Sequence, residues 1–122
     1  MTSVLDASAI LARLRREPGA DNVERALISG ACCGAANWSE VSQKIRTYGL
    51  SPAQARGLLD AYGFRIEPVT VGDAEWAAHR WRPRENLSLA DRLCLALGER
   101  LDAQILTADR SWGDSDSVTQ IR

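Results

Sequence analysis

A chain of 122 residues is the size of one globular domain, and its 45% hydrophobic and 25% charged residues are ordinary proportions for such a domain. Its 15 lysines and arginines nearly balance 16 acids, which leaves a formal net charge of -1. This balance excludes a general binder of nucleic acid or anionic membrane, because no global positive field attracts phosphate. Any contact with RNA must therefore come from a local patch.

The sequence excludes several other classes of protein. No stretch has the ~18–20 apolar residues of a membrane span, and the N-terminus lacks the basic and apolar regions of a signal peptide. Three cysteines, two of them adjacent at Cys32 and Cys33, give neither a disulfide framework nor a zinc-ligand spacing. With one histidine and a single lysine, Lys44, the chain also lacks most histidine-based chemistry and a P-loop. We therefore expect a cytoplasmic protein with no membrane segment.

The first half of the chain alternates short apolar runs with helical periodicity. A strand at residues 4–5 stops at Asp6, and a buried strand is predicted over the small-residue run 31–36. Apolar residues at helical spacing, bounded by glycine or proline, predict helices over residues 9–14, 23–28, 38–48 and 52–62. Each predicted strand is thus followed by helices.

The second half continues this alternation. Strands are predicted at residues 64–69, 104–107 and 118–121, with a loop over 108–116. One helix is predicted to be capped by Asp73 and ended by Pro83, and another opens with a capping box from Ser88 to Asp91. Because helices alternate with strands, without hairpin signals or repeats, we predict an α/β domain whose mainly parallel sheet is covered by helices on both faces.

Four acids fall just beyond the carboxyl ends of the predicted strands, the edge at which parallel sheets bind ligands. They are Asp6 after the first strand, Glu40 in the first turn after the second, Asp91 in the first turn of the late helix, and Asp109 after the strand at 104–107. Helix capping explains each acid alone. Together they repel one another unless a cation joins them, and an oxygen-only set suits Mg²⁺ or Mn²⁺. Such an ion activates water and stabilises charge on a phosphate.

Four segments that contain these acids resemble, in order, the acidic motifs of the PIN domain, and in particular of VapC, the toxin of type II toxin–antitoxin modules. The segments are Val4–Ala9, Asn37–Val41, Leu87–Arg92 and Leu106–Trp112. The resemblance runs through essentially the whole chain. It implies a single PIN domain over residues 1–122 with a three-layer α/β/α fold and a central sheet of about four to five strands.

The resemblance also implies an activity. A protein of this family is a Mg²⁺-dependent endoribonuclease, with Mn²⁺ as a substitute, that cleaves structured RNA such as tRNA or rRNA. It forms homodimers and is inhibited by a cognate VapB antitoxin. The implied catalytic acids are Asp6, Asp91, Glu40 and Asp109, of which the first two map most directly as metal ligands. Asp114 and Asp116 are alternatives to Asp109, because the last acid of the family varies in position.

Three neutral polar residues accompany the acids. Ser8 and Thr107 are placed to hydrogen-bond a carboxylate or a phosphate, and equally to serve as a helix cap and a β-branched strand residue. Asn37 precedes Glu40 in its motif, where an amide would fix a neighbouring loop. We therefore treat all three as candidate supporting residues.

Arginines gather in two places. Arg80, Arg82 and Arg84 flank Trp81, a combination that suits unpaired RNA and is also compatible with a solvated helix face. A second cluster, at residues 13–16, lies near a helix end that favours cations anyway. Either cluster would serve RNA or an acidic segment of an antitoxin, and the sequence leaves that choice open.

Two other functions were weighed against the ribonuclease. A phosphoacceptor receiver domain also gathers acids at the edge of a parallel sheet, but it needs a lysine after a late strand, and Lys44 lies in an early helix. The other is a catalytically inactive PIN-fold binding module that acts through protein partners. The sequence holds all four acids, so the ribonuclease is the main hypothesis and the inactive module is the alternative.

Overall fold

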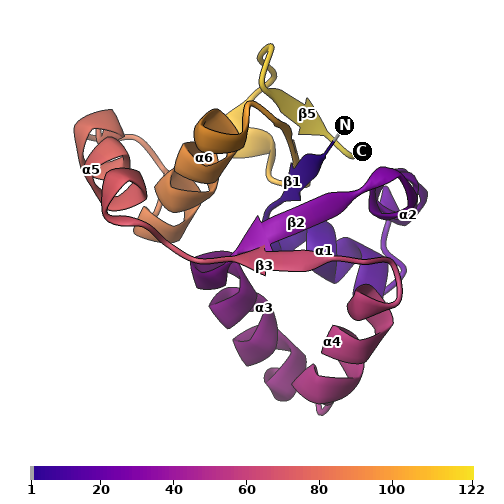
Figure 1. Cartoon of the computed structure of the whole chain (residues 1–122). Coiled ribbons are helices and arrows are strands. Elements are labelled where there is room, and N and C mark those ends of the chain that lie inside the picture. Colours follow the sequence, from indigo (N-terminus) through magenta and orange to yellow (C-terminus); the bar gives the residue numbers. More distant parts are fainter. Residues whose placement is uncertain (1) are drawn as a thin grey trace.

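A central parallel sheet organises residues 2–122, which the computed structural model describes (Figure 1). The strands are β1 (Ser3–Leu5), β2 (Ala31–Gly34), β3 (Arg65–Glu67), β4 (Gln104–Thr107) and β5 (Val118–Gln120). Their spatial order is β3-β2-β1-β4-β5, and all neighbouring strands pair in parallel. This confirms the predicted α/β fold with a parallel sheet. Because the chain builds one side from β1 to β3 and then returns to add β4 and β5, the order reverses beside β1.

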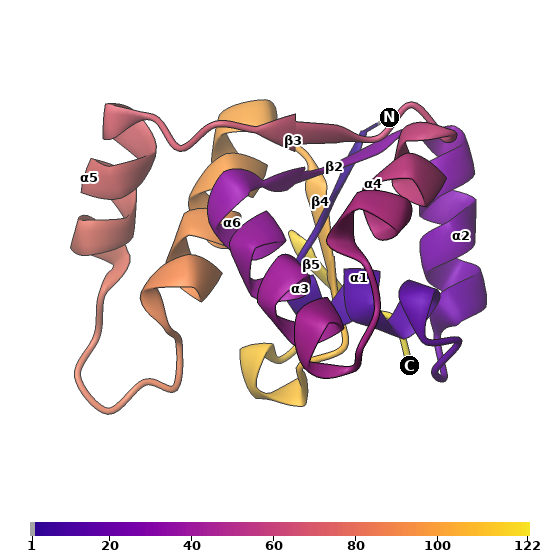
Figure 2. The same ribbon diagram turned by 90° about the horizontal axis from the view of Figure 1, so that it is seen from below.

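Helices cover both faces of this sheet. They are α1 (Ala7–Leu14), α2 (Ala20–Ser29), α3 (Ala35–Thr47), α4 (Pro52–Asp60), α5 (Val71–Arg80) and α6 (Leu89–Leu101), with a short 3-10 helix, η1 (Arg110–Trp112). Helices α1 to α4 pack on one face, and α6 packs on the other with α5 outside it (Figures 1 and 2). None of the helices formed by residues 2–122 has the length and apolar character needed to cross a membrane.

Consecutive strand residues supply two separate cores. In β1, Leu5 packs with α1 to α4, whereas the preceding Val4 packs with α6. Cys33 and Cys32 divide in the same way, because side chains alternate across a strand. Both faces of every central strand are therefore apolar, as expected for a parallel sheet buried between helical layers.

Four local predictions need correction. The predicted strand 31–36 ends at Gly34, because Ala35 already has helical geometry and begins α3. Glu40 consequently lies in the second turn of α3 and not in the first. Asp73 does not cap α5 from outside: Thr70 is the N-cap and Asp73 is the third helical residue, in a reciprocal capping box. The predicted loop 108–116 contains η1.

Candidate active site

Asp6 is the most enclosed of the acids, with 4% of its surface exposed. It follows β1 directly and caps α1, so that Oδ1 accepts hydrogen bonds from the Ala9 backbone N–H at 2.8 Å and from Ser8 Oγ at 2.7 Å. Oδ2 accepts from Thr107 Oγ1. Burial raises the pKa of Asp6 to about 6, although these three hydrogen bonds favour the charged form. Asp6 is thus a desolvated carboxylate held by neutral donors.

Ser8 and Thr107 join the ends of two neighbouring strands. Besides donating to Asp6, Ser8 Oγ accepts from the Ala108 backbone N–H at 2.9 Å, and Thr107 Oγ1 accepts from the Asp109 N–H at 3.0 Å. The pairing of Leu5 with Leu106 places Asp6 beside Thr107. Both hydroxyls therefore contact the acid that the sequence placed next to them, and they fix the start of the loop after β4.

Asn37 connects the glutamate to the start of α6. Its side chain is 1% exposed, and Nδ2 donates to Glu40 Oε1 and to the Ala90 carbonyl, both at 3.3 Å. Burial and repulsion from Asp91 raise the pKa of Glu40, while the Asn37 amide favours its charged form. The motif suggested a role for Asn37, but its contact with Ala90, 53 positions away, gave no signal in the sequence.

Asp91 and Asp109 each complete a helix cap. Asp91 Oδ2 accepts from the Ser88 N–H at 3.0 Å, and Ser88 Oγ accepts from the Asp91 N–H at 3.1 Å, which confirms the predicted capping box. Asp109 caps η1 by accepting from the N–H and Oγ of Ser111, at 2.9 and 2.7 Å. Capping and a functional role are compatible, since each carboxylate has a second oxygen that accepts no hydrogen bond within residues 2–122.

Asp91 is the centre of the acidic set. Burial raises its pKa and repulsion from Asp109 raises it further, while Asp91 in turn raises the pKa values of Asp6 and Glu40. The four predicted acids thus interact at the carboxyl edge of the sheet, each of the other three repelling Asp91. The fifth and sixth candidates lie elsewhere. Asp114 and Asp116 are exposed, and Asp116 lines a separate groove of about 600 Å³ between α6 and the loop that precedes β5.

The donor chemistry of this set fits a hard divalent cation. The four side chains are all carboxylates, and none of them forms an ion pair with a basic group in the described part of the chain. Their mutual repulsion is offset within the protein only in part, by the hydrogen bonds to the acids and by the charge of Lys44 near Glu40. As oriented, no three acidic, histidine or cysteine side chains among residues 2–122 form a complete ion-binding group. Side-chain rotation or bridging water is needed for the acids to surround one ion.

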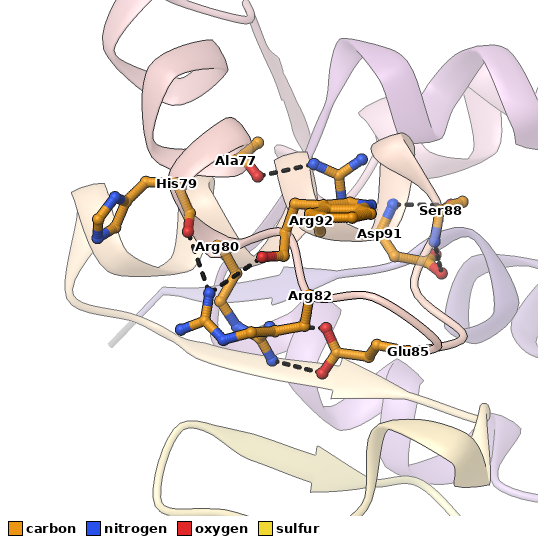
Figure 3. Close-up of polar contacts among 9 residues, drawn as sticks. Ala77, His79, Arg80, Arg82, Glu85, Ser88, Asp91 and Arg92 are labelled. Carbon is orange, nitrogen blue, oxygen red and sulfur yellow. Dashed lines mark hydrogen bonds and ion pairs between the residues drawn. The ribbon is translucent and has the colours of Figure 1, made fainter.

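The predicted basic cluster divides into separate roles (Figure 3). Arg80 is paired with Glu85 through two hydrogen bonds of 2.7 and 3.0 Å. Arg82 Nη1 donates to the carbonyls of His79 and Trp81, both at 3.1 Å. Arg84 makes no ion pair with the described residues. The sequence pattern does not distinguish these three arginines. In the described part of the structure only Arg80 is ion-paired, so the three differ in how free their charges are to bind another molecule.

Comparisons with known proteins bear on the family and the fold. The PIN domain family matches residues 3–116 of the chain. A ribonuclease VapC1 of Mycobacterium tuberculosis is 30% identical over 112 residues, which cover 87% of this chain and 84% of the relative. A toxin–antitoxin complex from Klebsiella pneumoniae superimposes with a TM-score of 0.78 at 17% identity, over 98% of both chains. Mycobacterium tuberculosis VapC20, a Sarcin-Ricin loop cleaving toxin, gives a TM-score of 0.66 at 17% identity, over 93% of this chain and 91% of that one.

Proposed function

This chain belongs to the PIN-domain family and to its VapC ribonucleases, and we propose that it is the Mg²⁺-dependent endoribonuclease toxin of a type II toxin–antitoxin module. The proposed reaction is hydrolysis of a phosphodiester bond in structured RNA, such as tRNA or rRNA. One observation carries the proposal: Asp6, Glu40 and Asp109 each interact repulsively with Asp91, and none of the four carboxylates forms an ion pair within residues 2–122. A bound cation would relieve this repulsion and favour the charged form of the set.

Each acid has a proposed part in holding the cation. Asp6 and Asp91 are the direct ligands, and Glu40 and Asp109 complete the set directly or through water. A divalent cation bound there lowers the pKa of a water molecule and stabilises the charge that develops on the phosphate. Mn²⁺ has the same preference for oxygen ligands and is expected to substitute.

Neutral side chains keep the acids charged and in position. Ser8 and Thr107 donate to Asp6, which favours the carboxylate form against the effect of burial. Asn37 does the same for Glu40 and ties it to the backbone just before Asp91. We assign these three residues a positioning role, since their contacts are with the acids and with the backbone.

The proposed partners follow from the family. A toxin of this class is held inactive by a VapB-type antitoxin, and a toxin–antitoxin complex is among the structures that share this fold. We further propose that residues 1–122 act as a single PIN domain and that two copies form a homodimer.

The test is RNA cleavage by the purified protein with Mg²⁺ and with EDTA. Asp6→Asn and Asp91→Asn are each expected to abolish cleavage without loss of circular dichroism signal, whereas Asp21→Asn, an exposed acid on α2, is expected to cleave normally. Full activity in EDTA, or in the Asp6→Asn/Asp91→Asn double variant, would exclude the mechanism.

Expression in cells tests the toxin function itself. Growth arrest is expected with the wild type and its relief with Asp6→Asn, and mapping RNA ends in the two cultures would identify the target. A wild type that binds its antitoxin but cleaves no RNA would favour the inactive binding module instead.

A further inference from the structure

The connection between α5 and α6 forms an arm, residues 81–87, at the end of the molecule that also carries the loop after β4 (Figure 2). The arm leads directly into Ser88, the N-cap of α6, three residues before Asp91. Arg80 at its start and Glu85 within it are joined by two hydrogen bonds of 2.7 and 3.0 Å (Figure 3). The ion pair closes residues 81–84 into a loop that immediately precedes the start of α6, the helix that carries Asp91.

Two arginines on this loop, Arg82 and Arg84, form no ion pair within the described chain, although Glu85 lies close enough to Arg82 for the two charges to interact. Glu85 pairs with Arg80, whose pKa is raised by that contact. Arg82 instead donates through Nη1 to the carbonyls of His79 and Trp81, which anchors one edge of its guanidinium at the end of α5. Neither Arg82 nor Arg84 forms an ion pair within residues 2–122. The arm therefore carries two arginines that form no ion pair with the residues described, just ahead of the helix that holds Asp91.

The backbone at Arg84 is costly for an arginine. Pro83 and Arg84 form a turn in which Arg84 has φ of 65°, a left-handed conformation that glycine adopts without penalty. Folding alone would favour glycine here. Arg16 and Asp102 share this conformation, so it does not by itself mark a binding site, but it makes Arg84→Gly a substitution that the backbone accommodates.

Trp81 adds an aromatic surface beside these charges. Its side chain is 57% exposed, and it is the only large hydrophobic side chain of the arm that is exposed. An exposed aromatic ring between arginines suits unpaired nucleotides, because the ring stacks on a base while the guanidinium groups contact phosphates. A protein partner would instead be expected to cover a broader apolar surface.

We propose that the arm binds a single-stranded segment of the RNA substrate, with Trp81 stacked on an unpaired base and Arg82 and Arg84 on the adjacent phosphates. This inference rests on the proposed ribonuclease function and names the contact that brings RNA to the acids. Arg80 and Glu85 hold the arm in place and do not themselves contact RNA.

Binding is measured separately from cleavage. The Asp6→Asn variant, with Mg²⁺ and a fluorescein-labelled single-stranded RNA, gives the reference affinity by fluorescence anisotropy. Trp81→Ala is expected to weaken binding about tenfold, and Trp81→Phe to retain most of it. Arg82→Gln/Arg84→Gln is expected to weaken binding and to reduce the dependence of log K on log salt by about 1.4, because each phosphate contact contributes about 0.7.

A matched control removes the same charge elsewhere. Arg16→Gln/Arg25→Gln alters two exposed arginines that likewise form no ion pair among residues 2–122, one in the connection between α1 and α2 and one on α2, the helix at the opposite side of the molecule from α5 in both views (Figures 1 and 2). Its RNA affinity is expected to stay within about twofold of the reference, since charges beyond a Debye length are screened.

Arg84→Gly separates binding from stability. Glycine relieves the backbone strain, so the unfolding midpoint is expected to remain or rise while RNA affinity falls. A purely structural arginine would give the opposite result, a lower midpoint with unchanged affinity.

Two outcomes would overturn the inference alone. Arm variants that bind RNA as the reference does, in a protein whose wild type cleaves RNA, would remove the arm from the substrate site and leave the proposed function intact. Arm variants that escape neutralisation by the antitoxin of the same module, with RNA affinity unchanged, would assign the arm to a protein partner. A reference variant without RNA affinity, together with a wild type without cleavage, would overturn both proposals.

Discussion

Replacing Asp6 by asparagine is expected to stabilise the folded protein while it removes the proposed activity. Asp6 is buried, and burial raises its pKa from 3.8 to about 6. At neutral pH the folded state therefore holds a charge that the unfolded chain solvates better. Asparagine has the same shape, keeps an oxygen for the donors at Ser8 and Ala9, and offers an amide to Thr107 Oγ1.

The expected gain follows from the pKa values. A rise from 3.8 to about 6 corresponds to about 3 kcal/mol, at 1.36 kcal/mol per pH unit. Asparagine caps a helix about as well as aspartate but loses a charge–dipole interaction of about 0.3–1 kcal/mol at the start of α1. The net gain is therefore about 2 kcal/mol, or about 5–10 °C in the unfolding midpoint of a chain of this length.

The pH dependence has a defined sign. Because the folded pKa of this acid is raised, the wild type gains stability from Asp6 below pH 3.8 and loses it as the pH rises to about 6. Asp6→Asn lacks this loss. The difference in the free energy of unfolding between Asp6→Asn and the wild type should grow from pH 3.8 to about 6 and stay constant at higher pH.

Urea or thermal unfolding followed by circular dichroism, in EDTA from pH 4 to 8, measures this difference. Asp114→Asn removes the same charge from an exposed loop and is expected to change the free energy of unfolding by less than about 0.5 kcal/mol. An Asp6→Asn protein less stable than wild type at pH 7.5, or a difference that does not vary with pH, would refute the reasoning.

Three other outcomes are expected. Mg²⁺ at a hundred times its dissociation constant should stabilise the wild type by about 2.7 kcal/mol in calorimetry, and equal stabilisation of Asp6→Asn would contradict the ligand assignment. Thr107→Val removes the hydroxyl that donates to Asp6 and should cost about 1–3 kcal/mol at pH 7, whereas Thr107→Ser should cost clearly less in the same unfolding assay. Gly98→Ala would place a Cβ 2.5 Å from Ile105 Cδ1, so a loss of about 1–3 kcal/mol is expected, with partial recovery in an Ile105→Val background; no loss would show that the two elements can separate.

The acidic set could be predicted from the sequence because parallel strands share one carboxyl edge. Any acid directly after a strand, such as Asp6 or Asp109, must lie there once the strands are known. The contacts that tune these acids could not be predicted. Thr107 lies 101 positions after Asp6 in the sequence. It can donate to Asp6 only because β1 and β4 are neighbours in the sheet.

The end of the second strand and the pairing of the arginines also could not be predicted from the sequence. Alanine suits a buried strand and a helix start equally, so the run from Ala31 to Ala36 gave no sign that the strand ends at Gly34. Likewise, the sequence pattern does not distinguish the arginines near Trp81 from one another. Only the fold shows that Glu85 pairs with Arg80 and that Arg82 and Arg84 form no ion pair with residues 2–122.

The central position of β1 has a consequence for synthesis of the protein. Its neighbour β4 and the last strand β5 come from residues 104–120, so the sheet pairs the first few residues with nearly the last ones. Contacts of such long range form late and slowly. On the ribosome, Asp6 emerges early but must wait for Thr107 and Asp109, so a partly translated chain has no assembled acidic set. If this set carries the proposed activity, a chain that ends before Thr107 and Asp109 would be inactive.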